Sequence, residues 1–145
     1  MKAMPLPCVL DASAGIKVFV SEDHSEDVQN LFRVAKENDA DLIYVPDLFF
    51  IECANVLWKK VRRGQYSKET AAENLADLDA LHLPTTASSQ LVERAFRIAC
   101  ELGITAYDAC YVALSESLDI PLLTADSRLA ALIADAGFKT ATLGD

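Results

Sequence analysis

The stretch Cys8-Val9-Leu10-Asp11-Ala12-Ser13 joins a short apolar run to a carboxylate and then to small residues. The apolar part predicts a buried β-strand over residues 8–11, and the residues after it predict a helix over 12–20. Pro121-Leu122-Leu123-Thr124-Ala125-Asp126 repeats this arrangement late in the chain. Two short strands that each end near an aspartate and lead into a helix indicate an α/β fold.

The rest of the chain alternates short apolar runs with longer segments of helical periodicity. Further strands are predicted over residues 42–45, 83–86, 122–124 and 139–143. Further helices are predicted over about 25–38, 48–63, 68–81, 88–102, 106–118 and 127–136. Asp47 and Ser67 are the predicted N-caps of the helices that follow them. The alternation predicts one domain over residues 1–145, a three-layer α/β/α sandwich with a mostly parallel sheet of about five strands.

Composition and length are those of one soluble domain. The chain has 145 residues, of which 52% are hydrophobic and 24% charged, so that it can bury a core. No apolar stretch approaches the roughly 20 residues of a membrane span. The first seven residues contain no apolar signal-peptide core, so we expect a cytoplasmic protein that does not contact membranes.

The cysteines do not form a metal-binding pattern. They are Cys8, Cys53, Cys100 and Cys110. None is paired at a Cys-x-x-Cys spacing, and neither histidine is near them in sequence, which argues against a zinc site. Because all four stand in apolar runs, we expect buried, reduced thiols.

The net charge of −9 argues against broad, non-specific binding of nucleic acid, which depends on phosphate neutralisation by Lys and Arg. A local basic strip is still possible. The one dense basic cluster is Lys59, Lys60, Arg62 and Arg63.

Four carboxylates stand beside the apolar segments: Asp11, Glu52, Asp108 and Asp126. Burying a lone carboxylate is costly unless another group compensates its charge. Ligands of parallel sheets bind at the carboxyl ends of the strands, where Asp11 and Asp126 are predicted to lie. Taken singly, both could instead cap a helix, and Asp108 stands at a capping-box spacing after Thr105.

Glu52 has no such alternative, because it lies about one turn inside an otherwise apolar helix. A surface position remains open for it, since Asn55, Lys59 and Arg63 follow on a related face. One acidic cleft would nevertheless explain all four carboxylates with a single cause. Oxygen ligands without His or Cys suit Mg²⁺ or Mn²⁺, so the four acids predict a metal-dependent hydrolase.

Each of the four acids stands in a short segment of mixed apolar and polar residues: Val9-Leu10-Asp11-Ala12-Ser13, Glu52-Cys53-Ala54-Asn55-Val56-Leu57, Thr105-Ala106-Tyr107-Asp108-Ala109 and Leu123-Thr124-Ala125-Asp126-Ser127-Arg128-Leu129. In this order the four segments resemble the PIN domain, and especially the VapC-type toxins of prokaryotic toxin–antitoxin pairs. The resemblance spans about residues 8–143. It implies a Mg²⁺- or Mn²⁺-dependent endoribonuclease that forms a homodimer and binds a small antitoxin, which blocks the cleft.

The resemblance also assigns roles to residues of this chain. The metal-binding and catalytic acids would be Asp11, Glu52, Asp108 and Asp126. Thr124 matches a position with a hydroxyl near the metal, and Ser13 and Asn55 match supporting polar positions. RNA binding would rely on the cluster from Lys59 to Arg63 and on Arg128.

Three other functions are weighed against the nuclease. An aspartate-nucleophile phosphatase needs a second Asp where Ser13 stands. A receiver module needs an acidic pair near the first strand and a Lys at a late strand end, whereas Asp11 stands alone and Lys139 begins its segment. A non-catalytic PIN-like interaction protein that binds metal or RNA remains the alternative.

Overall fold

A parallel five-stranded sheet forms the centre of the molecule, in the order β3-β2-β1-β4-β5. The computed structural model describes residues 5–20, 23–38 and 41–143. The strands are β1 (Cys8–Leu10), β2 (Ile43–Pro46), β3 (Thr85–Thr86), β4 (Leu122–Thr124) and β5 (Thr140–Thr142). The predicted α/β class and the five-stranded parallel sheet are therefore confirmed.

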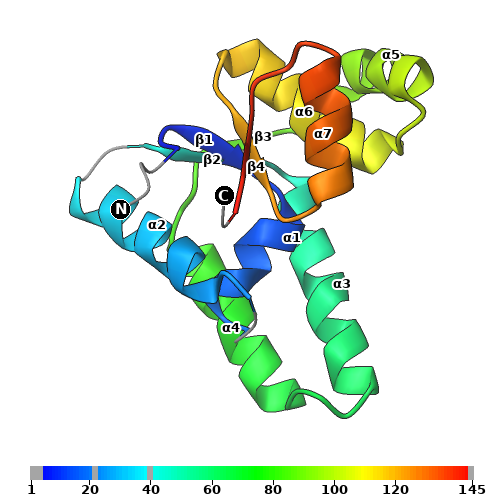
Figure 1. The fold of residues 1–145 in the computed structure, drawn as a ribbon. Helices are drawn as coiled ribbons and strands as arrows, with labels where there is room; N and C mark the ends of the chain where they lie inside the picture. The colour runs from blue at the N-terminus through cyan, green and yellow to red at the C-terminus, as the bar shows by residue number, and fades with distance from the viewer. Residues whose placement is uncertain (1–4, 21–22, 39–40, 144–145) are drawn as a thin grey trace.

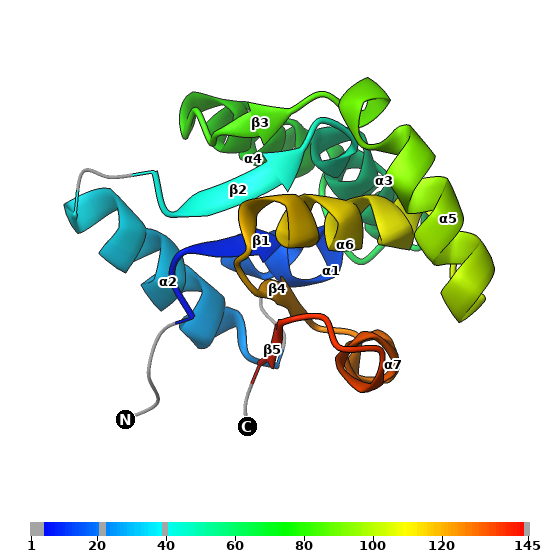
Figure 2. The same ribbon diagram turned by 90° about the horizontal axis from the view of Figure 1, so that it is seen from above.

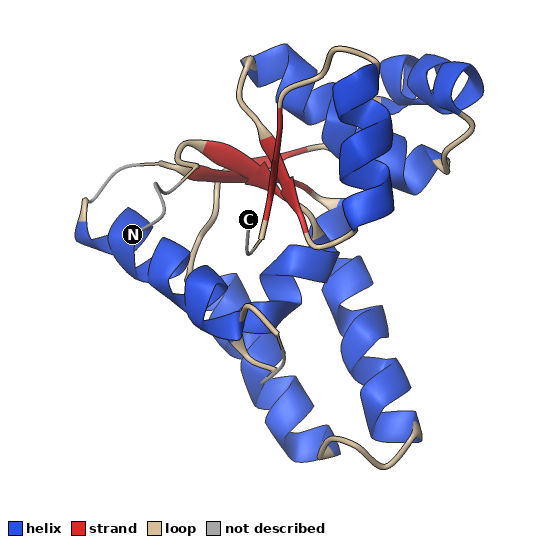
Figure 3. Ribbon diagram, viewed as in Figure 1, coloured by secondary structure: helices blue, strands red, loops and turns tan. Residues whose placement is uncertain are grey.

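Helices cover both faces of this sheet (Figures 1 and 3). They are α1 (Ala12–Gly15), α2 (Ser25–Glu37), α3 (Leu48–Arg62), α4 (Lys68–Ala80), α5 (Val92–Leu102), α6 (Ala106–Leu118) and α7 (Ser127–Asp135), with short 3-10 turns at Ile16–Val18 and Ser88–Gln90. The connections from β1 to β2 and from β2 to β3 run towards one edge of the sheet, and those from β3 to β4 and from β4 to β5 run towards the other edge. Right-handed crossovers in opposite directions place their helices on opposite faces. Accordingly, α1 to α4 lie on one face and α5 to α7 on the other (Figures 1 and 2).

The strand order places a topological switch point between β1 and β4. Leu10 of β1 pairs with Leu123 of β4, and both strands are buried along their whole length. Helix α6 packs across β1, β2 and β4 through a continuous buried run, residues 109–115. In parallel sheets of this kind, ligands bind at the carboxyl ends of the strands beside the switch point.

A close approach between α1 and α3 fixes the walls of that region. A Cβ atom at Gly15 would lie 2.7 Å from the Phe49 ring, so a larger residue would push the two helices apart. Phe49 is fully buried and lies on the first turn of α3. The glycine therefore sets the spacing between the helix that follows Asp11 and the helix that carries Glu52.

Several local expectations were wrong. The predicted helix 12–20 is a single turn of α-helix followed by a 3-10 turn. The Asp47 side chain does not cap α3 but accepts a hydrogen bond from the backbone N–H of Ser88 at 3.0 Å. Three cysteines are buried and reduced as expected, whereas Cys100 is exposed on α5.

Within the described ranges, no helix is both long and apolar enough to cross a bilayer. Residues 1–4, which carry part of the argument against a signal peptide, lie outside those ranges.

Candidate active site

All four carboxylates line one hollow of about 240 Å³ at the carboxyl ends of the strands. They come from four places in the chain: Asp11 follows β1, Glu52 lies on α3, Asp108 on α6, and Asp126 precedes α7. The other lining residues are Ala12, Ser13, Asn55, Val56, Lys59, Tyr111 and Leu129. The fold therefore brings together the four acids that the sequence predicted to share a cleft.

Asp11 is the most buried of the four, with 6% of its surface exposed. Its Oδ1 accepts hydrogen bonds from the backbone N–H of Ala14 at 3.0 Å and the hydroxyl of Ser13 at 2.6 Å. Burial raises the pKa of Asp11 to about 6; hydrogen bonds from Ser13, Thr124 and Ala14 oppose the rise, and the charge of Asp108 adds to it. Asp11 thus caps α1 and also presents a carboxylate that is costly to ionise.

Ser13 and Thr124 join the ends of β1 and β4. The two hydroxyl oxygens lie 3.3 Å apart, and Ser13 Oγ also accepts the backbone N–H of Ala125 at 3.1 Å. Thr124 Oγ1 accepts the backbone N–H of Asp126 at 3.1 Å. Thr124 is fully buried, so its hydroxyl supports the hollow from below and does not line it.

Asp126 and Asp108 both stand at helix starts, as the capping alternatives predicted. Asp126 Oδ1 accepts the backbone N–H groups of Arg128 and Leu129 at 3.0 and 3.1 Å, and so caps α7. At α6 the cap is Thr105, whose hydroxyl accepts the N–H of Asp108 at 3.1 Å. Burial raises the pKa of Asp108, and the charge of Asp126 adds to the rise. Capping and lining the hollow are therefore compatible.

Glu52 is half-buried, and its carboxylate is held by a residue that the sequence reasoning missed. The Tyr111 hydroxyl donates a hydrogen bond to Glu52 Oε1 at 2.6 Å. Burial raises the pKa of Glu52; the bond from Tyr111 opposes the rise and the charge of Asp108 adds to it. Tyr111 read as one more apolar residue of α6, but its position three residues after Asp108 is the signal that places both on one helix face.

Of the remaining predicted site residues, Asn55 and Lys59 line the hollow on α3, next to Glu52. Arg63 and Arg128 are exposed and are not among the lining residues. Their proposed contact with RNA stays a prediction.

The donor set fits a hard cation in its chemistry, because carboxylate and hydroxyl oxygens line the hollow and no His or Cys of the described residues does. Burial, with a smaller contribution from neighbouring carboxylates, raises the pKa values of Asp11, Glu52 and Asp108, and a bound cation would favour their ionised forms. Over the described part of the chain, no three His, Cys, Asp or Glu side chains lie close enough together to bind one ion. Joint coordination would therefore require the carboxylates to draw together.

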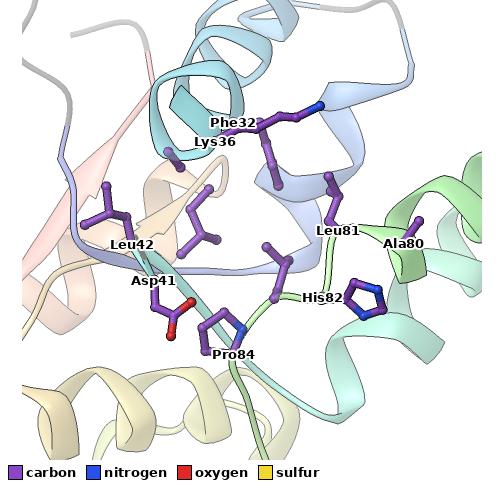
Figure 4. A pocket seen from close by; sticks show the side chains of 11 residues that line it. Phe32, Lys36, Asp41, Leu42, Ala80, Leu81, His82 and Pro84 are labelled. Atoms are coloured by element: carbon purple, nitrogen blue, oxygen red, sulfur yellow. The ribbon is translucent and has the colours of Figure 1, made fainter. Parts of the chain in front are cut away.

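A second hollow, of about 320 Å³, lies at the opposite end of the sheet, by the starts of β2 and β3 (Figure 4). Its walls combine apolar side chains such as Phe32 and Pro84 with Lys36, Asp41 and His82. Among the residues that the structure describes, one carboxylate, that of Asp41, lines this hollow, compared with four at the carboxyl ends of the strands.

Comparison with known proteins shows the family and the fold of this chain. The PIN domain family model matches residues 8–134. Ribonuclease VapC3 of Pyrobaculum aerophilum is 36% identical over 124 residues, covering 84% of this chain and 91% of the relative. Ribonuclease VapC1 of Mycobacterium tuberculosis is 37% identical over 133 residues, covering 86% and 89%. The crystal structure of PAE2754 from Pyrobaculum aerophilum superimposes with a TM-score of 0.69 at 26% identity, covering 90% of this chain and 81% of that one.

Proposed function

The chain belongs to the PIN domain family, and we propose that it is a Mg²⁺- or Mn²⁺-dependent endoribonuclease of the VapC toxin type. One observation carries the proposal: four carboxylates from four separate elements line a single hollow at the switch point of the sheet. Relatives of 36–37% identity are named ribonucleases.

The four acids would have different roles in metal binding. Asp11 and Asp108 would hold a metal ion directly, and Glu52 and Asp126 would bind it directly or through water. A bound cation lowers the pKa of a coordinated water and polarises a phosphate oxygen. Tyr111 orients Glu52, and the Ser13 hydroxyl keeps Asp11 in place. Either Glu52 or Asp126 could then orient the attacking water.

RNA would be held by cations at the edge of the hollow. Lys59 lines it beside Asn55, and Arg63 follows one turn later as the C-cap of α3. Arg128, at the start of α7, is the third proposed contact. These positions concentrate positive charge where the substrate backbone would lie, although the whole chain carries a net charge of −9.

The relationship to VapC proteins also supports proposals about partners. We propose that a small antitoxin blocks the hollow, that the toxin is a homodimer, and that it acts on RNA in the cytoplasm. Co-expression with the protein encoded beside it, followed by co-purification and light scattering, tests both assemblies.

The activity is tested by incubating the purified protein with single-stranded and structured RNA in Mg²⁺ or Mn²⁺. Cleavage should occur, EDTA should stop it, and Asp11→Asn should remove most of it while circular dichroism shows an intact fold. Full activity in the Asp11→Asn variant would contradict the assignment. Metal binding without cleavage of any RNA would support a non-catalytic PIN-like binding protein instead.

A further inference from the structure

A half-exposed tryptophan lies on the outer surface of α3, close to the carboxylate hollow. Trp58 is the only tryptophan of the chain, and 53% of its surface is exposed. The guanidinium carbon of Arg62 lies 5.3 Å from the centroid of its ring. A cation at this distance is attracted to an aromatic face and limits the orientations of the ring. The pair therefore presents a partly ordered aromatic surface to solvent.

The pair is next to the hollow along the helix. Asn55, which lines the hollow, lies three residues before Trp58, and Lys59, which also lines it, lies three residues before Arg62. Residues three apart on a helix are neighbours on its surface. At 1.5 Å per residue, Trp58 lies roughly 9 Å along the axis from Glu52. A short oligonucleotide bound in the hollow would reach it.

The surroundings of Trp58 are basic, although the chain as a whole is acidic. The last turn of α3 and its C-cap carry Lys59, Lys60, Arg62 and Arg63. Together with α4, this half of α3 projects away from the sheet and from α5 to α7 (Figure 1). A projecting surface that combines cations with an exposed aromatic ring is complementary to a polyanion with unpaired bases.

We propose that Trp58 and Arg62 form a stacking platform for an unpaired base of single-stranded RNA, next to the carboxylate hollow. The proposal rests on the proposed function and extends it, because it names the form of RNA that the hollow receives. Lys59 and Arg63 would contact phosphates while the ring of Trp58 stacks on a base. Stacking is tolerant of sequence, since every base has a π-face. The platform therefore selects unpaired RNA and not a particular sequence.

The sole tryptophan makes intrinsic fluorescence a direct report on the platform. A 12-nucleotide single-stranded RNA, added in Mg²⁺ to the cleavage-blocked Asp11→Asn protein, should quench or shift the emission in a saturable manner. The same RNA annealed to its complement, and inorganic polyphosphate, offer phosphates without unpaired bases. They should bind through charge with little change in emission.

Substitution tests the contribution to affinity. Trp58→Ala, made in the Asp11→Asn background, should weaken binding of fluorescently labelled single-stranded RNA roughly 5- to 150-fold, the range expected for losing one stacked base. Trp58→Phe should retain most of the affinity. Phe96→Ala removes a similarly exposed aromatic ring from α5 and is the matched control, with no expected effect. Because Trp58 is half-exposed, circular dichroism should show that its variants fold.

The outcomes separate the platform from the proposed function. Unchanged emission on RNA binding, or an unchanged affinity in Trp58→Ala, overturns the platform whether or not RNA is cleaved. Quenching and weakened binding without cleavage by the wild-type protein support the platform and contradict the nuclease.

Ile51 lies two turns before Trp58 on α3 and is also exposed, so the two side chains form an apolar stripe along the helix. If emission follows protein concentration in the absence of RNA, and Trp58→Ala dissociates an oligomer, the stripe is a contact between copies and the platform is overturned.

Discussion

Two groups of carboxylates on this molecule have opposite surroundings: those of one group form ion pairs, and those of the other do not. In the groove between α5, α6 and the segment from α7 to β5, Glu116 pairs with Arg94 at 2.7 Å and Asp119 with Lys139 at 2.8 Å. The hydrogen bond from Arg94 lowers the pKa of Glu116. In the hollow at the strand ends, the pKa values of Asp11, Glu52 and Asp108 are all raised, with burial as the largest cause.

The difference shows which carboxylates lack a cationic partner within the protein and would need a bound cation to neutralise their charge. In the groove, Glu116 and Asp119 each have a cationic side chain of the same chain as a partner. Among the described residues, no ion pair involves an acid of the hollow. Uncompensated charge in a cleft lowers stability and is typical of a functional site. The hollow is therefore the place where we expect a bound cation, and the groove is structural.

Activity is the first and largest test of this contrast. Asp11→Asn should lower kcat/KM for RNA cleavage roughly 100-fold or more, because losing a carboxylate that we propose to bind the metal should exceed the 10- to 100-fold effect of changing an outer partner. Glu116→Gln, in the groove, should cleave at the wild-type rate. Initial rates on one labelled RNA measure both. Equal losses in the two variants would remove the distinction between the two groups.

Stability in EDTA should change in the opposite direction to activity. The pKa of Asp11 is about 6 in the folded protein and about 4 when unfolded, so the folded state binds the extra proton between these values. Wild-type stability therefore falls as the pH rises from about 4 to above 6. Asp11→Asn, which keeps a capping oxygen, avoids this loss and should be more stable at pH 8, by on the order of 3 kcal/mol.

Urea denaturation at pH 4 and pH 8 measures the effect. The two proteins should differ little at pH 4, where Asp11 stays protonated in the folded state and is only about half ionised in the unfolded state. A variant that gains nothing at pH 8 would show that the buried carboxylate is already compensated.

The sequence was a good guide to the site wherever the information was local. Asp11 was found because it follows a short apolar strand, and Glu52 was found because it interrupts an apolar helix. Both patterns can be recognised from the neighbouring residues alone. Tyr111 was missed because its hydroxyl meets Glu52, which is 59 residues away. The Asp47 cap failed for the same reason, since its partner Ser88 is 41 residues away. Long-range hydrogen bonds leave no local pattern.

A smaller loss of stability should follow from removing the hydrogen bonds of Ser13, which join the ends of β1 and β4. Ser13→Ala removes the hydroxyl that donates to Asp11 and accepts from Ala125. It should cost about 1 kcal/mol of stability, typical of one hydrogen bond. It should also raise the pKa of Asp11 further, because a bond that favours the ionised form is lost.

Carboxyl-carbon NMR titration of the metal-free protein follows the pKa of Asp11. Ser117→Ala, at an exposed position of α6, is the control and should leave it unchanged. An unchanged pKa in Ser13→Ala would mean that this serine does not hold the carboxylate in solution.

The smallest change in stability is expected for a substitution in the groove, and the direction of that change is what distinguishes the two groups of acids. Glu116 has a lowered pKa, so its pairing with Arg94 stabilises the protein above the unfolded pKa of about 4.5. That contribution is lost as the pH falls through the folded pKa, in contrast to the contribution of Asp11, which declines as the pH rises.

Glu116→Gln should therefore be slightly less stable than wild type at pH 7 and equal to it in acid, because exposed ion pairs contribute little. High salt should reduce the difference at pH 7, since the pair is open to solvent. A gain in stability at pH 7 would place Glu116 with the uncompensated acids and remove the basis for treating the two groups differently.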